Sequence, residues 1–412
     1  MAAAEHARPP WALLLSLYTT QYLAPGFFMV ALVAILRRAG MPLEQLGAIY
    51  LLGLFWVLKF LWAPWVDRLS FGRWGHERGW LLLAQAGMVL ALLAMAPLDP
   101  VQDFSRVLAG CVVVGALSAT QDLAADALAC RRLAPSDRAL GNAIQAAGGL
   151  LGNLLGAGAV LVLYERIGWA GAMALLAAGT AVTWVQLLAL REPPQPRVPP
   201  ERAGLRASVV GLWRRPQGAR WLAMLALYPV GVSMAYALLT PLLADAGWSL
   251  EGIGWVVNGL GSLLGIVSAL ATGWLIRRGG RRRALVVAAA LQVPGVLALL
   301  PLVGGDSGTG AALAGAGLLF LFYNPALVVM STLMMDRVDP ARPATDYALQ
   351  YGLFLGFATV VTGGATALAG VLGYGTVLAL AVLAALAAVP LALTTNAGLA
   401  GPQEPAARAA TR

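Results

Sequence analysis

Three ionisable side chains interrupt the otherwise apolar segments of this 412-residue chain. Lys59, the only lysine, and Asp122 and Asp126 lie inside or at the edge of long apolar runs. A charge at the centre of a membrane helix costs about 2.5–3.5 kcal/mol by insertion scales, so it is a functional candidate by default. The i,i+4 spacing of the two aspartates puts both carboxylates on one helix face. We expect Lys59 and Asp122 at similar depth. They form either a proton- or charge-coupling cluster, with Asp126 as a third member, or an ion pair that only locks helices together.

Polar and aromatic side chains near the middle of the apolar runs form a second candidate set. Several of them flank prolines at 25, 229 and 325. A proline frees a backbone carbonyl, and such breaks are tolerated where a cavity, a water or a neighbour satisfies that carbonyl. Any one of these residues could instead be an ordinary kink or a packed side chain. As a set, the residues of the first, seventh and tenth spans predict a substrate-binding cavity. The repeat-related Gln145 and Gln350, early in the fifth and eleventh spans, either line the cytoplasmic half of the pathway or bond across the pseudo-two-fold axis. The candidate substrate-binding residues are Gln21, Tyr22, Gln121, Gln145, Tyr228, Tyr236, Tyr323, Asn324, Gln350 and Tyr351.

A charged loop follows the second apolar run, and an arginine-rich counterpart follows the eighth. A carboxylate and arginines at facing helix ends can form an ion-pair latch that depends on conformation. The alternative is simple anchoring by positive charge at the membrane surface, which is sufficient for the second copy because that copy lacks the acid. The candidate gating residues are Asp67, Arg68, Arg73, Arg277 and Arg278.

Long apolar windows position these candidates. The chain is 59% hydrophobic and only 11% charged, whereas soluble domains carry about 25% charged residues. Crossing the hydrocarbon core takes about 20 helical residues. The first window is too long for the apolar region of a signal peptide, so we interpret it as a membrane helix. Twelve spans are predicted, at 11–36, 45–66, 79–97, 104–127, 139–164, 170–190, 220–245, 252–276, 284–303, 311–335, 347–370 and 375–395.

The positive charges are distributed very unevenly between the two sides of these spans. Of the 28 Lys and Arg residues, 23 lie on the side of the termini and 4 on the other. The positive-inside rule therefore predicts that both termini are cytoplasmic. Because the net charge of +9 follows this topological pattern, we expect a membrane surface and no nucleic acid as its partner.

The two halves of the chain are predicted to be repeats. Residues 39–47 match 246–254 at an offset of 207, and other matches occur at 205 and 210. Two six-span halves in the same orientation form parallel repeats. We therefore expect an all-α integral membrane protein with an N-terminal half at 1–190, a cytoplasmic Pro/Arg-rich linker at 191–219, a C-terminal half at 220–396 and a cytoplasmic tail at 397–412.

Other classes of function find little support in the residues. No Gly-x-x-x-x-Gly-Lys-Ser/Thr motif occurs, which excludes ATP-driven transport within this chain. A membrane enzyme would need a nucleophile with its base, a metal set or an acid–base dyad, and Asp122 with Asp126 is the only candidate dyad. A non-transporting receptor would not need polar residues at mid-span. We expect no enzyme activity, no cofactor and no metal site.

Two motifs resemble a known family. The segment from Asp67-Arg68 to Gly72-Arg73 is similar to the Asp-Arg…Gly-Arg signature of the major facilitator superfamily. Residues 59–68 together with 119–127 resemble the branch that contains AmpG-type muropeptide permeases and the pyochelin/rhizobactin-type siderophore permeases. The resemblance covers the whole chain. It implies the twelve-span major facilitator fold and a location in the bacterial inner membrane.

Two departures bear on the choice within this branch. Muropeptide permeases often have further spans after the twelfth, and they tend to have an acid where this chain has Ala129-Cys130-Arg131-Arg132. The resemblance therefore favours import of a ferric, pyochelin-like siderophore from periplasm to cytoplasm by proton symport and alternating access. An AmpG-type muropeptide permease, or a transporter of another small molecule, is the alternative. The expected partners are the substrate, the lipid bilayer and a co-transported proton, and the sequence is compatible with a monomer.

Overall fold

The structure, a computed structural model, describes residues 9–190, 192, 204–215 and 217–395. These residues form helices and short connections without any strand, so the predicted all-α membrane fold is confirmed. Within them, ten helical stretches are long and apolar enough to cross a membrane. One of these, residues 138–189, holds two crossings that meet at Gly168, and a shorter apolar stretch covers Gln45–Leu61. Each of the twelve predicted windows therefore has a helical counterpart.

The first six crossings occupy the N-terminal half. Several are broken into α, 3-10 and π segments. In chain order the segments that matter below are α1 (Trp11–Gly26), η1 (Phe27–Leu32), α2 (Val33–Arg38), α3 (Leu43–Tyr50), α4 (Leu54–Leu58), η3 (Lys59–Leu61), α5 (Ala63–Arg68), α6 (Glu77–Met95), α7 (Phe104–Arg132), α8 (Arg138–Asn153), η5 (Leu154–Ala159) and α9 (Val160–Ala189).

A linker helix and six further crossings complete the described chain. They are α10 (Leu205–Arg214), which belongs to the linker, followed by α11 (Gly218–Leu227), α12 (Val230–Asp245), α13 (Leu250–Gly254), η6 (Trp255–Leu260), α14 (Gly261–Gly279), α15 (Arg281–Leu297), α16 (Leu300–Val303), α17 (Thr309–Asp336), α18 (Pro343–Leu372) and α19 (Tyr374–Thr394).

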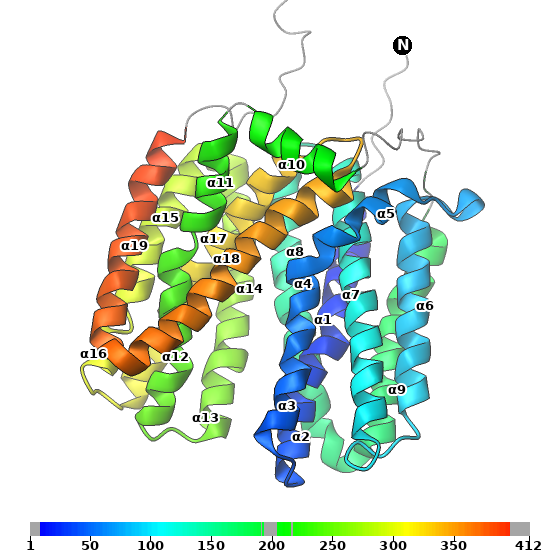
Figure 1. Cartoon of the computed structure of the whole chain (residues 1–412), viewed down its shortest axis with the longest axis horizontal. Helices are drawn as coiled ribbons and strands as arrows, with labels where there is room; N and C mark the ends of the chain where they lie inside the picture. The colour runs from blue at the N-terminus through cyan, green and yellow to red at the C-terminus, as the bar shows by residue number, and fades with distance from the viewer. Residues whose placement is uncertain (1–8, 191, 193–203, 216, 396–412) are drawn as a thin grey trace, which may run out of the picture.

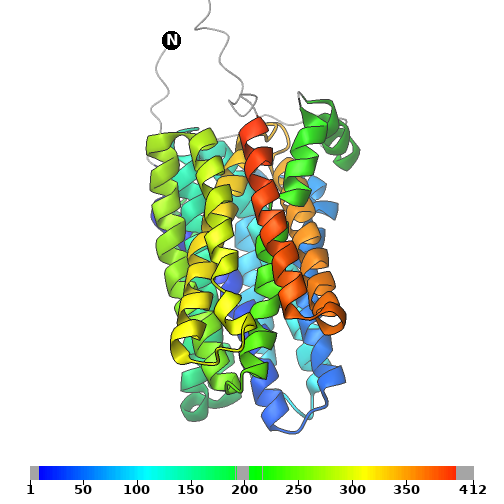
Figure 2. The same ribbon diagram turned by 90° about the vertical axis from the view of Figure 1, so that its left-hand side faces the viewer.

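The two halves stand side by side as upright helix bundles. In Figure 1 the N-terminal half is on the right and the C-terminal half on the left, with α8 and α14 between them. The linker helix α10 lies across one end of the molecule, which we call the linker side, and Figure 2 shows the same placement after a quarter turn. Helix α18 runs obliquely across the front of Figure 1, and its first residues reach α5 of the other half.

Glycines with positive φ make equivalent reversals in the two halves. Gly168 (φ 65°) separates the fifth and sixth crossings, and Gly373 (φ 79°) separates the eleventh and twelfth. Only glycine adopts this backbone region without steric cost. The two glycines are 205 residues apart, the offset at which the sequence halves match.

Prolines interrupt the crossings less than the sequence suggested. Pro25 lies within α1, which continues into the π-helical η1, and Pro325 lies within the unbroken α17. A proline at position i leaves the carbonyl of i−4 without its helical donor. The Ser118 hydroxyl donates to the carbonyl of Gln21, and the Ser268 hydroxyl donates to that of Leu321 at 2.5 Å. At Pro25-Gly26 the α-helix thus changes to a π-helix, at Pro325 the helix stays unbroken, and in both places a neighbouring serine satisfies the freed carbonyl.

The pair Tyr228-Pro229 is a real interruption. It forms a turn between α11 and α12. The seventh crossing is therefore the one in which a predicted proline break occurs as such.

Three hydrophobic clusters hold the bundles together. One draws on both halves and consists of residues near the linker-side ends of the crossings. The second contains only residues of the N-terminal half, from Leu23 to Ala177, and the third only residues of the C-terminal half, from Val232 to Ala385. The two halves therefore share a core on the linker side and have separate cores toward the opposite side.

Candidate functional site

A buried charge cluster lies between the second and fourth crossings. Lys59 is fully buried, and its Nζ is 2.5 Å from Asp122 Oδ2 and 3.1 Å from Asp126 Oδ2. The two aspartates occupy one face of α7, as their spacing predicts, and Lys59 begins the 3-10 turn η3 opposite them. Lys59 and Asp126 are therefore both buried inside the protein.

The two carboxylates differ in their other partners. Asp126 Oδ1 accepts hydrogen bonds from Gln145 Nε2 at 2.7 Å and from the Tyr18 hydroxyl at 3.2 Å. Asp122 Oδ1 is buried and has no hydrogen-bond partner among the described residues. One lysine neutralises only one of two carboxylates, so the cluster has one surplus negative charge unless it binds a proton or a cation. A surplus charge in a buried site is costly.

An aromatic ring of the C-terminal half lies next to this cluster, and one further pair of aromatic rings stacks in each half. The ring centroid of Tyr351 lies 5.1 Å from Lys59 Nζ. Tyr22 stacks on Trp56 at 5.3 Å, and Tyr236 stacks on Tyr323 at 6.2 Å. Tyr236 is 43% exposed although it lies in the middle of α12.

Tyr22, Tyr323 and Tyr351 are partly exposed at mid-crossing as well. These four predicted tyrosines therefore keep part of their surface accessible.

Other predicted lining residues bond within the helix packing. Gln121 donates to the Leu17 carbonyl, and the hydroxyl of the fully buried Tyr228 donates to the Leu285 carbonyl. The amide of Asn324 bonds its own helix at Phe320.

Gln350 is also fully buried. It accepts from Trp221 Nε1 at 2.8 Å and donates to the carbonyls of Met334 and Asp346. The side chains of Gln121, Tyr228, Asn324 and Gln350 therefore all have partners within the helix packing.

Of the two remaining glutamines, Gln145 contacts the cluster and Gln21 does not bond to it. Gln21 is buried, and its Oε1 has no partner among the described residues. Gln145 joins the two halves, since it donates to Asp126 and accepts from the Tyr347 hydroxyl of α18 at 3.1 Å. A hydrogen-bonded path therefore runs from the charge cluster across the seam between the halves.

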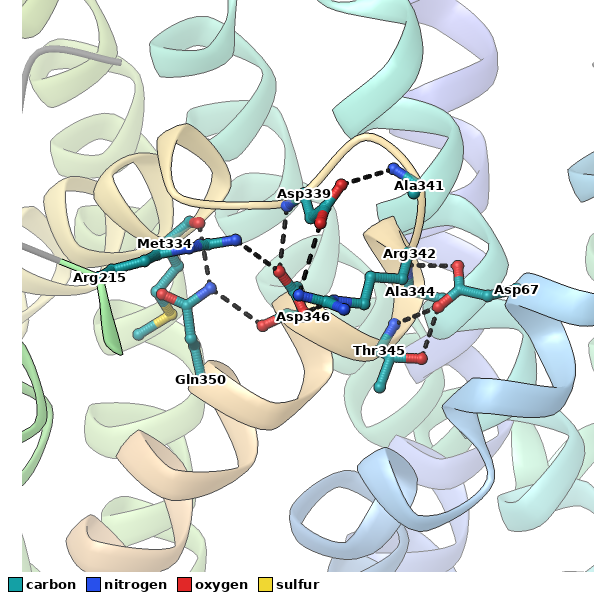
Figure 3. A network of polar contacts seen from close by, with 10 residues as sticks. All are labelled: Asp67, Arg215, Met334, Asp339, Ala341, Arg342, Ala344, Thr345, Asp346 and Gln350. Atoms are coloured by element: carbon teal, nitrogen blue, oxygen red, sulfur yellow. Dashed lines mark hydrogen bonds and ion pairs between the residues drawn. The ribbon is translucent and has the colours of Figure 1, made fainter. Parts of the chain in front are cut away.

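Asp67 closes the linker side by a contact between the halves (Figure 3). Its carboxylate accepts from the backbone N–H groups of Ala344 at 3.0 Å and Thr345 at 2.8 Å, and from the Thr345 hydroxyl at 2.5 Å. These residues form the first turn of α18, whose N–H groups have no partners within the helix. Asp67 thus caps a helix of the other half, where the helix dipole favours a negative charge.

Burial has the largest effect on the pKa of Asp67. The carboxylate is 2% exposed. Desolvation raises the pKa of Asp67 to about 6, against the lowering effect of its hydrogen bonds from Thr345 and Ala344.

A second contact across the seam was not predicted. Asp336, at the end of α17, pairs with Arg138 of the N-terminal half at 3.0 Å and with Arg281 of its own half at 2.5 Å. Arg281 Nη2 also donates to the carbonyl of Pro135. In the N-terminal half the pair Arg131–Glu77 occupies the matching helix ends with the charges reversed. Acids and arginines at equivalent helix ends were the signal in the sequence.

The arginines named as candidate latches lie elsewhere. Arg277 and Arg278 are exposed at the end of α14, and the Arg278 guanidinium stacks over Trp274 at 4.4 Å. Arg68 is exposed, and the side chain of Arg73 lies outside the described residues. The expectation of an aspartate–arginine latch at Asp67 is therefore corrected, because the acid bonds a helix N-terminus.

The end of the linker helix α10 also contacts α18. Asp346, one turn into α18, accepts from Arg342 Nε at 2.8 Å and pairs with Arg215, which follows α10, at 3.0 Å (Figure 3). It also accepts from the N–H of Asp339 at 3.0 Å. The start of α18 therefore contacts both halves and the linker. Within the described residues, no three His, Cys, Asp or Glu side chains are grouped as a metal site.

Comparison with known proteins gives one family and several relatives. The model of the Major Facilitator Superfamily matches residues 14–362. The anhydromuropeptide permease of Escherichia coli K12 is 34% identical over 256 residues, which cover 61% of this chain and 52% of the permease. The putative transporter AmpG 4 of Rickettsia felis is 23% identical over 62% of this chain and 65% of its own length. The chain thus spans about half to two thirds of the length of these relatives.

Solved structures share the fold over nearly the whole chain. The human organic anion transporter MFSD10 superposes with a TM-score of 0.71 at 19% identity, covering 93% of this chain and all of that one (100%). FucP in its outward conformation has a TM-score of 0.69 at 14% identity, covering 95% and 99%.

Proposed function

This chain belongs to the Major Facilitator Superfamily, whose family model covers most of it, and we propose that it imports a muropeptide-like small molecule by proton symport. The observation that supports this most is the buried cluster of Lys59, Asp122 and Asp126 beside aromatic rings of both halves. Ionisable groups inside membrane proteins mark proton relays and substrate pathways.

The substrate class rests on the relatives. The anhydromuropeptide permease, at 34% identity, supports a muropeptide, and neither of the relatives described above is named for a siderophore. The expectation of siderophore import rested on the compact length and on Ala129–Arg132, and neither outweighs this similarity. A muropeptide offers sugar rings that stack on Tyr22, Tyr236 and Tyr323, and carboxylates that would pair with Lys59.

Orientation follows from the distribution of charge. We propose that the linker side faces the cytoplasm of a bacterial inner membrane, because 23 of the 28 positive residues lie on that side. The described conformation then has its cytoplasmic ends closed by the Asp67 cap and the Asp336–Arg138 pair. The shared core on that side and the separate cores on the other suit substrate entry from the periplasm.

The charge cluster would couple this entry to a proton. A proton neutralises the surplus negative charge, so the occupied cluster is less costly to bury when the halves rock and close over the substrate. Protonation of Asp126 removes the charge from its hydrogen bond with Gln145, and charge-assisted bonds are about twice as strong as neutral ones. Gln145 then holds Tyr347 of α18 less firmly, two residues after the threonine that Asp67 binds. We propose this path as the link between proton binding and the cytoplasmic gate.

Uptake into spheroplasts tests this function. Radiolabelled anhydromuropeptide and, in parallel, iron-55-loaded pyochelin are offered with and without the protein, before and after a protonophore. We expect protein-dependent uptake of the muropeptide that stops with the protonophore. Uptake of the iron complex alone would reject the substrate class, and muropeptide uptake that survives the protonophore would reject the coupling.

A further inference from the structure

A groove opens on the linker side beside a close contact between the two halves. Helices α8 and α14 meet at Gly273, where a Cβ atom would lie 2.7 Å from the Cβ of Ala143. The adjoining groove has a volume of about 460 Å³ and is lined by Leu140 of the N-terminal half and Leu270, Trp274, Arg277 and Arg278 of the C-terminal half. Its wall is therefore apolar, and its outer end is positively charged.

The two arginines of this groove are not neutralised by the protein. Arg277 and Arg278 are exposed, and neither pairs with an acid among the described residues. Arg278 only stacks on the Trp274 ring. By contrast, Arg138 and Arg281, which lie on the same side, both pair with Asp336. The groove therefore presents two uncompensated guanidinium groups next to a hydrophobic surface.

We propose that this groove binds an anionic phospholipid, with the phosphate at Arg277 and Arg278 and an acyl chain along Leu140, Leu270 and Trp274. The guanidinium fork matches phosphate geometry, and basic pockets between membrane helices bind anionic headgroups. The groove lies at the end of α14, where a spanning helix leaves the hydrocarbon. A free phosphate ion would use the arginines but leave the apolar wall uncovered, so the lipid accounts for the whole surface.

Bound lipid would favour one arrangement of the halves. Leu140 belongs to one half and the other lining residues to the other, so the groove exists in this form only while α8 and α14 are in contact. A ligand shifts a conformational equilibrium toward the state that it binds better. The lipid therefore stabilises closure on the linker side.

Native mass spectrometry of the full chain tests the site. The purified protein is titrated with phosphatidylglycerol or phosphatidylcholine, and the retained lipid is counted. The double variant Arg277→Gln, Arg278→Gln is compared with Arg282→Gln, Arg283→Gln, which makes the same change of charge at exposed arginines outside the groove. We expect the wild type to prefer phosphatidylglycerol, the groove variant to bind it about tenfold more weakly, and the control to bind as the wild type does.

Two results would overturn the proposal. Equal losses in both double variants would mean general attraction to positive charge, and no preference for the anionic lipid in the wild type would mean that no site exists. Thermal unfolding of each variant in the same detergent shows whether it is folded. The measurement involves no substrate, so its outcome is independent of the proposed transport.

Discussion

The fully buried ammonium of Lys59 faces two carboxylates, and only one of them has further partners. Asp126 is supported by Gln145 and Tyr18, whereas one oxygen of Asp122 has no partner among the described residues. Removing one partner of a buried pair leaves an uncompensated charge and costs about 3–5 kcal/mol, whereas removing both can be nearly neutral. Substituting Lys59 and Asp122 singly and together can therefore distinguish a role in proton coupling from a purely architectural role.

A double-mutant cycle measures this pair. Lys59→Ala should lower the thermal stability strongly, because it leaves two buried carboxylates without a cation, whereas Asp122→Ala leaves Lys59 paired with Asp126 and should cost less. The double variant should be more stable than the two losses add up to, because only Asp126 then lacks a cation. Uptake should remain lost in the double variant, since Asp126 then lacks both the lysine and the second carboxylate that complete the proton-binding cluster. Additive losses of stability would argue against the pairing seen at 2.5 Å.

At the scale of elements, the tenth crossing continues through Pro325 because Ser268 donates to the freed carbonyl of Leu321. Ser268→Ala should destabilise the protein by about 1–3 kcal/mol, the cost of an unsatisfied buried acceptor. Adding Pro325→Ala restores the helical N–H donor and should recover most of this loss. Thermal unfolding checks both variants, with Thr272→Ala as control because that hydroxyl bonds only its own helix. A double variant no more stable than Ser268→Ala would contradict the explanation.

The cap between Asp67 and α18 predicts a pH dependence of linker-side closure. The pKa of Asp67 is about 6 when buried, above the ordinary value of 3.8, to which it returns when the helix ends part and water reaches it. A group whose pKa is raised in one state stabilises that state below the ordinary pKa, and this contribution is lost as the pH rises through the raised value. Closure should therefore weaken as the pH rises from 3.8 to about 6.

Spin labels at Ser70 and Arg282, exposed residues of opposite halves, measure this closure. The buried Cys111 and Cys130 are first replaced by alanine so that only the two engineered cysteines react. Double electron–electron resonance should show the distances lengthening over this pH range, and Asp67→Asn should remove that step. Shortening distances, or the same step in Asp67→Asn, would show that Asp67 is not responsible.

The crossings could be predicted from the sequence because long apolar runs have one stable form in lipid. Lys59 and Asp122 could be paired from their depth alone. The sequence could not predict which of the candidate side chains line a cavity. The helices are apolar on every face, so the sequence does not fix how each helix is rotated about its axis. Tyr228 and Gln350, for example, were expected to line a cavity and are instead fully buried in the helix packing.

The two contacts that close the linker side join residues that lie far apart in the sequence. Asp67 binds Thr345, which is 278 residues away, and Asp336 binds Arg138 across the seam. No periodicity or local motif joins such helix ends, since their meeting depends on how the two bundles dock. Arg277 and Arg278 were the gating arginines that the repeat suggested, and they line the groove between α8 and α14 instead.

At the scale of the whole molecule, the halves share a core only on the linker side, and the path Asp126–Gln145–Tyr347 crosses that seam. Tyr347→Phe keeps the ring and removes the hydroxyl. We expect the variant to fold and bind substrate but to lose much of the dependence of uptake on the proton gradient. Proteoliposome uptake with and without an inward acid gradient measures this, and an unchanged gradient dependence would exclude Tyr347 from the coupling path.

Proton movement driven by the substrate is the most direct measure of proton symport through the buried cluster. Proteoliposomes that contain a pH-sensitive dye receive anhydromuropeptide outside, without any imposed gradient. We expect the lumen to acidify with the wild-type protein and not with Asp122→Asn, while both proteins are inserted and unfold cooperatively at similar temperatures. Substrate accumulation without acidification in the wild type, or full acidification in Asp122→Asn, would contradict proton symport through the buried cluster.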